Sequence, residues 1–278
     1  MKVRLKLWVK IILSVILIIA ALLIYGFFIN NHGYKVKEIA IYDNIPSEYN
    51  GLKIVHISDI NYGNTVKNKQ LKKIINNINL IKPDIIVFTG DLIYKDSKTN
   101  TDELTKLLSK MDYNIGAYYI TGDEDIDTTA SDILNNSGFI NLDDTYNLIY
   151  QSTNPILIAG ISTSEIDTNI NDKLKSTLEY KNNNPTYSIL LMHEPNNIND
   201  INYENFNLIL AGHTHGGYIK IPILGGLVLG DNYSYGKDYY IKENTNIYIS
   251  NGLGNSKFKY RFFNKPSFNF YRLRKNNS

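Results

Sequence analysis

His213 and His215 stand one residue apart between glycines, directly after an apolar run at residues 208–211. The run predicts a buried strand, and a strand that ends in His-x-His brings two imidazoles to the edge of its sheet. The flanking glycines let the backbone and a ligand come close. This arrangement indicates a metal site, although a single His-x-His pair also occurs in surface turns.

Other candidate ligands stand where four further apolar runs end. The residues that follow these runs are Asp59, Asp91, Asp123 and His193. In open α/β sheets, ligands bind in the crevice beyond the carboxyl ends of the strands, so all six side chains should converge there. A turn or a helix cap explains a single aspartate at least as well. Their repetition at equivalent strand ends favours a shared site.

The segments that position these residues alternate between strand and helix patterns. Residues 34–43 alternate as a half-buried strand does, and residues 84–89 are apolar throughout, as in a strand buried on both faces. Residues 66–81 and 102–111 have the apolar spacing of amphipathic helices. The pattern predicts an α/β protein.

Later segments give weaker patterns. Short alternating runs predict strands that complete a second sheet, at residues 239–241, 247–249 and 268–271. Between aromatic residues, Lys257, Lys259 and Arg261 predict a solvent-exposed strand face rather than a nucleic-acid-binding stripe. Turns and surface loops are indicated at residues 135–138, 143–144 and 182–184.

The N-terminal segment has the composition of a membrane anchor. Residues 11–29 carry no charge and are long enough to cross about 30 Å of hydrocarbon as a helix. Basic residues precede them at Lys2, Arg4, Lys6 and Lys10. The positive-inside tendency places residues 1–10 in the cytoplasm and the chain after Asn30 outside, in a single-pass cell-membrane topology. A cleaved signal peptide is the alternative, but its apolar region is usually about 7 to 15 residues long.

Charge and cysteine content exclude several functions. Of the 29 Lys and Arg in the 278 residues, four lie before the anchor, which leaves 25 against 27 Asp and Glu, a formal charge of −2. A domain with this balance has no basic field for nucleic-acid binding. The absence of cysteine excludes disulfides, thiolate metal sites and thiol nucleophiles.

In order and spacing, residues 36–273 resemble the calcineurin-like metallophosphoesterases, in particular their membrane-anchored or exported bacterial branch. That family's pattern is Asp-x-His, Gly-Asp, Gly-Asn-His-Asp/Glu, a lone His, and Gly-His-x-His. The matching stretches are Ile57-Ser58-Asp59-Ile60-Asn61, Thr89-Gly90-Asp91-Leu92, Thr121-Gly122-Asp123-Glu124-Asp125, Met192-His193-Glu194-Pro195 and Gly212-His213-Thr214-His215-Gly216-Gly217. The resemblance implies a four-layer αββα sandwich with a two-metal site at the sheet ends, here preceded by one transmembrane helix.

The resemblance also implies roles for matching residues. Asp59 and His215 would hold the first metal, His193 and His213 the second, and Asp91 would bridge both. A metal-activated hydroxide would then attack phosphorus in line with the leaving oxygen. The implied substrate is a phosphorylated small molecule, lipid or envelope component.

Three residues depart from the family's pattern. Asn61 replaces a metal-binding His, Asp123 replaces a ligating Asn, and Glu124 replaces the His that contacts phosphate and assists the leaving group. The first metal site becomes richer in oxygen ligands, which favours manganese over zinc, with iron and magnesium as further candidates.

Glu124 is the departure with the largest chemical consequence. Beside two divalent cations the pKa of a carboxyl group is depressed, so Glu124 would stay ionised and would neither donate a proton nor attract a phosphate. Loss of a general acid typically costs about 10²- to 10⁴-fold in rate. Two functions therefore remain open, a phosphoesterase with an altered site and a metal-binding protein of the same fold that acts in binding or scaffolding without turnover.

Overall fold

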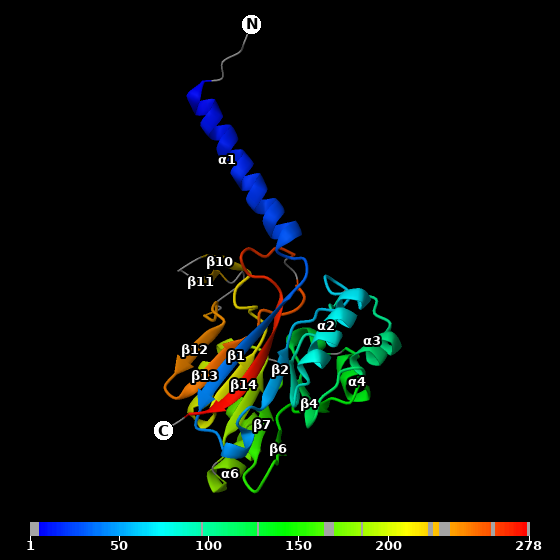
Figure 1. The fold of residues 1–278 in the computed structure, drawn as a ribbon, viewed down its shortest axis with the longest axis vertical. Helices are drawn as coiled ribbons and strands as arrows, with labels where there is room; N and C mark the ends of the chain where they lie inside the picture. The colour runs from blue at the N-terminus through cyan, green and yellow to red at the C-terminus, as the bar shows by residue number, and fades with distance from the viewer. Residues whose placement is uncertain are drawn as a thin grey trace.

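Two six-stranded sheets packed face to face form the centre of the protein (Figure 1). The computed structural model describes residues 6–95, 97–126, 128–163, 170–184, 186–221, 225–227, 234–256 and 259–276. Apolar side chains from both sheets, such as Val87 and Ile189, form a fully buried core between them. Strands that are apolar throughout therefore lie in the middle of each sheet.

The first sheet has the order β1-β14-β2-β3-β4-β5. Its strands are β1 (Lys35–Asp43), β14 (Ser267–Lys275), β2 (Lys53–Ile57), β3 (Ile85–Thr89), β4 (Gly116–Ile120) and β5 (Ile140–Asn141). β14 runs parallel to β1 and antiparallel to β2. The sequence predicts a strand at residues 268–271, within β14, but places it in the second sheet. That placement is wrong, because an alternating pattern indicates a strand and its buried face but not the strands beside it.

The second sheet has the order β12-β13-β9-β8-β7-β6. Its strands are β12 (Tyr239–Lys242), β13 (Thr245–Ile249), β9 (Leu208–Ala211), β8 (Ser188–Met192), β7 (Ile156–Gly160) and β6 (Tyr146–Ile149), and β10 (Ile219–Ile221) and β11 (Gly225–Leu227) form a separate hairpin. The predicted strands β12 and β13 are confirmed in this sheet. No strand is predicted from the sequence at β6 or β7.

Helices cover the outer face of each sheet. α2 (Asn68–Ile81), α3 (Thr101–Leu108) and α4 (Ala130–Asn136) pack on the first sheet, while α5 (Ile170–Lys173) and α6 (Lys175–Asn183) pack on the second. Short helical turns lie in the connections between these elements, at Ser47–Tyr49, Asp123–Asp125, Pro195–Asp200 and Tyr203–Asn205. The arrangement is the αββα sandwich expected from the sequence, so the predicted fold class is confirmed.

A single apolar helix projects from the domain at the N-terminal end (Figure 1). It comprises α1 (Leu7–Ile24) and a π-helical turn, η1 (Tyr25–Ile29). The 23 residues Leu7–Ile29 are long and apolar enough to cross a membrane, because about 1.5 Å per residue spans the hydrocarbon core. Residues 1–5 of the predicted cytoplasmic tail lie outside the described residues.

The end of this helix packs against the loop that precedes β14. The rings of Phe27 and Tyr260 meet with centroids 4.8 Å apart, and those of Tyr25 and Phe262 with centroids 5.7 Å apart. Asn31 accepts a hydrogen bond of 3.1 Å from the side chain of Asn255. The helix is therefore attached to the loop between β13 and β14, which also borders the candidate site.

Candidate two-metal centre

The loops after β2, β3 and β9 hold the candidate ligands in an uncommon backbone conformation. Positive φ angles occur at Asp59 (49°), Asn61 (45°), Asp91 (63°), His213 (61°) and His215 (53°). Each such non-glycine residue costs about 1–3 kcal/mol and persists where its surroundings fix it. Five of the seven candidate ligands share this conformation, so their concentration at the strand ends of the two sheets is itself a mark of a functional site.

Two carboxylates and two imidazoles meet at the carboxyl ends of the central strands. In Asp91, Asp123, His193 and His213, one potential ligand atom from each lies within 4.8 Å of all the others. Asp123 Oδ1 is 2.9 Å from His193 Nε2 and 3.0 Å from His213 Nδ1. His193 Nε2 is 3.4 Å from Asp91 Oδ1. These donors suit a divalent transition metal.

His193 is oriented by the backbone of β3. Its Nδ1 lies 2.6 Å from the carbonyl oxygen of Thr89, so Nδ1 carries the proton and Nε2 faces the carboxylates. Burial lowers the pKa of His193, but the charges of Asp91 and Asp123 outweigh it and raise the pKa well above its usual value. The cluster therefore concentrates negative charge and favours a cation.

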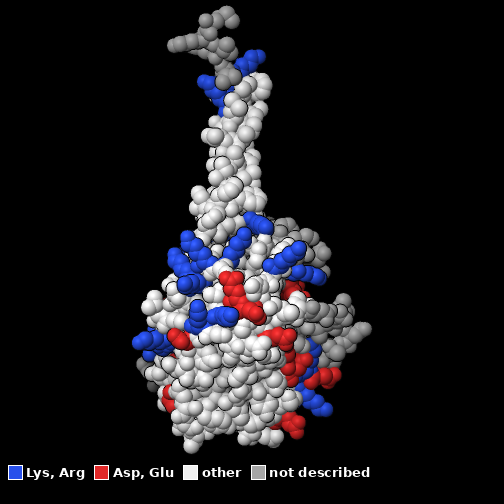
Figure 2. All heavy atoms as spheres, turned by 90° about the vertical axis from the view of Figure 1, so that its right-hand side faces the viewer, with Lys and Arg blue, Asp and Glu red and all other residues white. Residues whose placement is uncertain are grey.

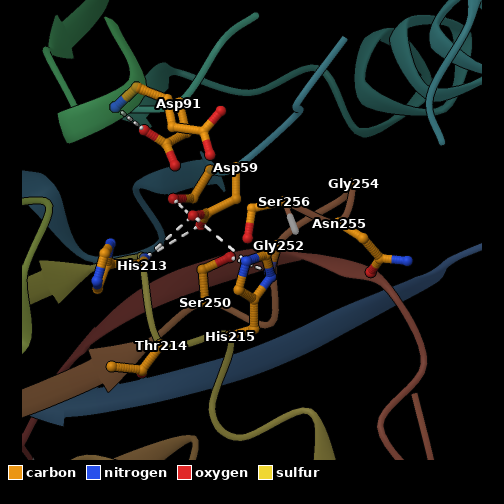
Figure 3. Close-up of polar contacts among 12 residues, drawn as sticks. Asp59, Asp91, His213, Thr214, His215, Ser250, Gly252, Gly254, Asn255 and Ser256 are labelled. Carbon is orange, nitrogen blue, oxygen red and sulfur yellow. Dashed lines mark hydrogen bonds and ion pairs between the residues drawn. The ribbon is translucent and has the colours of Figure 1, made fainter. Parts of the chain in front are cut away.

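A second group, of Asp59, Asn61 and His215, lies beside the first. His215 Nε2 is 3.7 Å from Asp59 Oδ1, and the backbone N–H of His213 donates to Asp59 at 3.2 Å (Figure 3). Burial raises the pKa of the Asp59 carboxyl. Asn61 is fully buried, and neither its amide oxygen nor its amide nitrogen has a hydrogen-bond partner among the described residues.

The unpartnered amide of Asn61 is the observation that fits a metal at this second group. A buried polar atom without a partner costs about 1–3 kcal/mol. A cation would accept the Asn61 oxygen as a ligand and remove part of that cost. The residues present therefore fit a second cation beside the four-residue cluster.

Arg261 and Asn251 contact His215 at the Nδ1 side of its ring. His215 Nδ1 lies 3.0 Å from the Asn251 carbonyl oxygen and 2.9 Å from an Arg261 amino group. Arg261 also donates to the carbonyls of Asn251 and Gly254, both at 2.6 Å. The prediction of an exposed strand face is wrong for Arg261, which is fully buried and whose pKa burial lowers to about 10.

Glycines at two loops leave room for these ligands. A Cβ at Gly122 would collide with Asp91 Oδ1, and one at Gly252 would collide with the His215 ring. Gly252 also has a φ of 68°, in the left-handed region that favours glycine. Figure 3 shows Gly252 directly beside His215.

Glu124 lies at the edge of the centre rather than in the four-residue cluster. Its Oε2 accepts a 3.2 Å hydrogen bond from the Lys95 N–H, and its own N–H donates to Asp91 Oδ1 at 3.0 Å. Burial raises the pKa of the Glu124 carboxyl, and the charges of Asp91 and Asp123 raise it further. The depressed pKa expected from the sequence requires the charge of two bound cations.

Asp125 is a positioning residue that sequence reasoning did not single out, although it is the third acidic residue of its stretch. Its carboxylate accepts from the backbone N–H groups of Asp91 and Leu92, both at 2.8 Å, and of Gly122 at 3.0 Å. Burial and the charge of Asp91 raise the pKa of Asp125 to about 7. This carboxylate joins the loop after β3 to the loop after β4.

Replacing Asp125 with alanine should weaken metal binding by about 10- to 100-fold, because the bonds that orient a metal ligand typically contribute that much. Titration of the metal-free protein with manganese measures the change. Asp132→Ala, which alters an exposed carboxylate on α4, is the matched control and should bind metal normally. Unchanged affinity in a folded Asp125→Ala protein would contradict the role.

The sequence of this chain matches a known protein family and several of its members. Residues 52–217 match the family model described as calcineurin-like phosphoesterase. The chain belongs to this family. Its relatives include the uncharacterized metallophosphoesterase YkuE of Bacillus subtilis, 31% identical over 91% of this chain and 90% of the relative. Members are metal-dependent hydrolases, and the clustered carboxylates and imidazoles provide ligands for a divalent ion.

Of two further relatives, one has a diacylated substrate in its name and the other is named as a transmembrane protein. The UDP-2,3-diacylglucosamine pyrophosphatase LpxG of Chlamydia trachomatis is 25% identical over 80% of this chain and 84% of its own length. A transmembrane protein with metallophosphoesterase domain from Danio rerio is 28% identical over 86% of this chain, which spans 57% of that relative.

Proposed function

We propose that this protein is a membrane-anchored, extracytoplasmic phosphoesterase that uses two divalent metals to hydrolyse a phosphomonoester or phosphodiester. The convergence of Asp91, Asp123, His193 and His213 within 4.8 Å carries the proposal. Two divalent cations bound here would activate the attacking water and neutralise the phosphoryl oxygens.

Each side chain has a defined part in this proposal. Asp59, Asn61 and His215 would hold the first metal, Asp123, His193 and His213 would hold the second, and Asp91 would be a ligand of both. The amide oxygen of Asn61 and the added carboxylate of Asp123 make the centre rich in oxygen ligands. Manganese is therefore the preferred metal, ahead of iron, magnesium and zinc.

The proposed location follows from the apolar helix. Residues 1–10 lie in the cytoplasm, residues 11–29 cross the cell membrane, and residues 36–273 form the catalytic domain outside. The apolar segment Leu7–Ile29 and the basic residues before and within its start support this topology. A domain held at a bilayer suits a phosphorylated lipid or envelope component, a class to which the named substrate of LpxG also belongs.

A second function, metal binding without turnover, is supported by Glu124. Its carboxylate bonds to the Lys95 N–H and brings negative charge to the edge of the centre. Four carboxylates, at Asp59, Asp91, Asp123 and Glu124, would neutralise two divalent cations and leave no net attraction for a phosphate. In that case the domain would serve as a binding or scaffolding protein.

Manganese-dependent hydrolysis of aryl phosphates separates the two functions. The full chain in detergent should bind about two manganese ions and hydrolyse p-nitrophenyl phosphate or its diester. Two bound ions without hydrolysis of either would favour the scaffolding function, and a folded protein without bound metal would contradict both.

A soluble fragment that begins near Asn30 is expected to fold and to bind the same number of metals as the full chain. It keeps the Asn31 side chain, which bonds to Asn255. It loses the aromatic contacts of η1 and the hydrogen bonds that Tyr260 and Arg261 donate to backbone carbonyls of the helix. Elemental analysis of both proteins after manganese dialysis tests this. A folded fragment that binds fewer metals would show that the helix end supports the site.

A further inference from the structure

A basic pocket lies at the end of the domain from which the apolar helix rises. It encloses about 650 Å³ between the start of β1, the first turns of α2 and the loop before β14. Its polar lining includes Tyr34, Lys67, Lys69, Lys73, Asn77 and Lys265. Figure 2 shows Lys and Arg side chains gathered around the base of the helix.

The charges of this pocket are unbalanced. Four lysines line it, and among the described residues that line it there is no aspartate or glutamate. Elsewhere on the domain, by contrast, Lys37 and Lys220 are paired with Asp238, and Arg272 with Glu38. A pocket of one charge sign on a domain with a slight excess of acidic residues attracts an anion.

The pocket is built by specific contacts between two elements. The Tyr34 hydroxyl donates to the Lys73 carbonyl at 3.0 Å and accepts from the Asn77 side chain at 2.8 Å. The Tyr34 ring also lies against Phe268 of β14, with centroids 6.0 Å apart. The chain leading into β1 is thereby fixed against α2, and the lysines of α2 are held beside it.

The position of the pocket identifies its anion. η1 ends at Ile29, and Gly33, which lines the pocket, follows four residues later, within about 14 Å of chain. The headgroup layer adds about 5–8 Å to each side of the hydrocarbon, and charges act over about 8–10 Å beyond it. On the other wall, Lys265 follows Phe263, whose ring contacts Tyr25 of η1.

We propose that this pocket binds anionic phospholipid headgroups of the leaflet on which the domain sits, and so holds the domain against the membrane in one orientation. The lysines supply the charge, and Asn77 and Tyr34 supply neutral hydrogen-bonding groups at the pocket wall. The pocket is formed by residues other than the candidate metal ligands, so lipid binding here requires no metal. The inference rests on the proposed anchoring of the helix in a bilayer.

Amine labelling of the full chain in lipid nanodiscs tests the proposal. In discs that contain phosphatidylglycerol, Lys67, Lys69, Lys73 and Lys265 should each react about fivefold more slowly than in phosphatidylcholine discs, as expected for a lysine at an anionic surface. About 1 M salt should remove the difference, because the Debye length falls to about 3 Å. Lys82 and Lys110, exposed lysines outside the pocket, are internal controls and should react equally in both discs.

A pair of triple variants distinguishes lipid binding at the pocket from an effect of the total surface charge. Lys67→Gln, Lys69→Gln and Lys73→Gln together should abolish the protection of Lys265, which remains as the reporter. The matched triple change Lys82→Gln, Lys106→Gln and Lys110→Gln removes the same charge from positions outside the pocket and should leave Lys265 protected. Equal protection of Lys265 in both variants would overturn the proposal.

Three further outcomes are informative. Protection of the pocket lysines by inorganic phosphate in phosphatidylcholine discs, without protection by phosphatidylglycerol, would assign the pocket to a soluble anion and overturn the membrane role. A chain extracted from membranes by carbonate would contradict the anchor itself. A chain embedded in both discs with equal labelling would contradict only the lipid site.

Discussion

Replacing Asp91 with alanine is expected to reduce metal-dependent phosphoester hydrolysis by about 10³-fold or more, since a metal centre contributes several kcal/mol to the transition state. Asp91 is the residue proposed to contact both metals, and it is 98% buried beside His193. Its removal would leave two bound cations without the anion proposed to lie between them. Steady-state kinetics with p-nitrophenyl phosphate and elemental analysis of the dialysed protein measure the two effects.

His56→Ala provides the control for Asp91→Ala. His56 is fully buried in β2, and its Nε2 lies 2.8 Å from the Thr89 hydroxyl. Burial lowers the pKa of His56 to about 3, so the ring is neutral and packs in the core. This variant should lose stability but keep its metals. Loss of metal from His56→Ala, with metal retained in Asp91→Ala, would show that the ligands are assigned wrongly.

The central strands could be predicted from the sequence because burial on both faces requires runs of apolar residues. β3 and β9 show this pattern, and all of their side chains are buried. The neighbours of a strand could not be predicted in the same way. β14 alternates like β12, yet it lies between β1 and β2, where hydrogen bonds with residues more than 200 positions away decide its place.

The candidate site shows the same division between residue type and environment. The ordered strand ends predict Asp91, Asp123, His193 and His213, which the fold brings together. The supporting contacts involve ordinary residue types without a local pattern. Arg261 is an example. In the sequence it stands between aromatic residues, as an exposed strand residue would, whereas in the structure its guanidinium donates to the carbonyls of Asn251 and Gly254.

The departures from the family's pattern at Asn61 and Glu124 lead to a prediction of increased activity, in contrast to the loss expected for Asp91→Ala. Asn61→His combined with Glu124→His is expected to raise phosphoesterase activity by at least about tenfold, within the usual contribution of a general acid. The first change gives the first metal a nitrogen ligand in place of an amide oxygen.

The second change acts on the leaving group. A histidine at position 124 has an ordinary pKa of about 6.5, so it can donate a proton near neutral pH where Glu124 beside two cations cannot. It also removes one negative charge from the edge of the centre. Both changes stabilise the transition state more than the ground state.

Substrates with different leaving groups distinguish proton donation from a general gain in metal affinity. Alkyl phosphates need the leaving oxygen to be protonated, whereas p-nitrophenolate leaves without a proton, so the double variant should gain more on the alkyl substrate. Asn61→His alone should raise metal affinity and activity on both substrates about equally. A double variant that binds two metals yet gains activity on neither substrate would mean that the centre serves binding rather than turnover, because its ligands and its proton donor would then be in place without a reaction to use them.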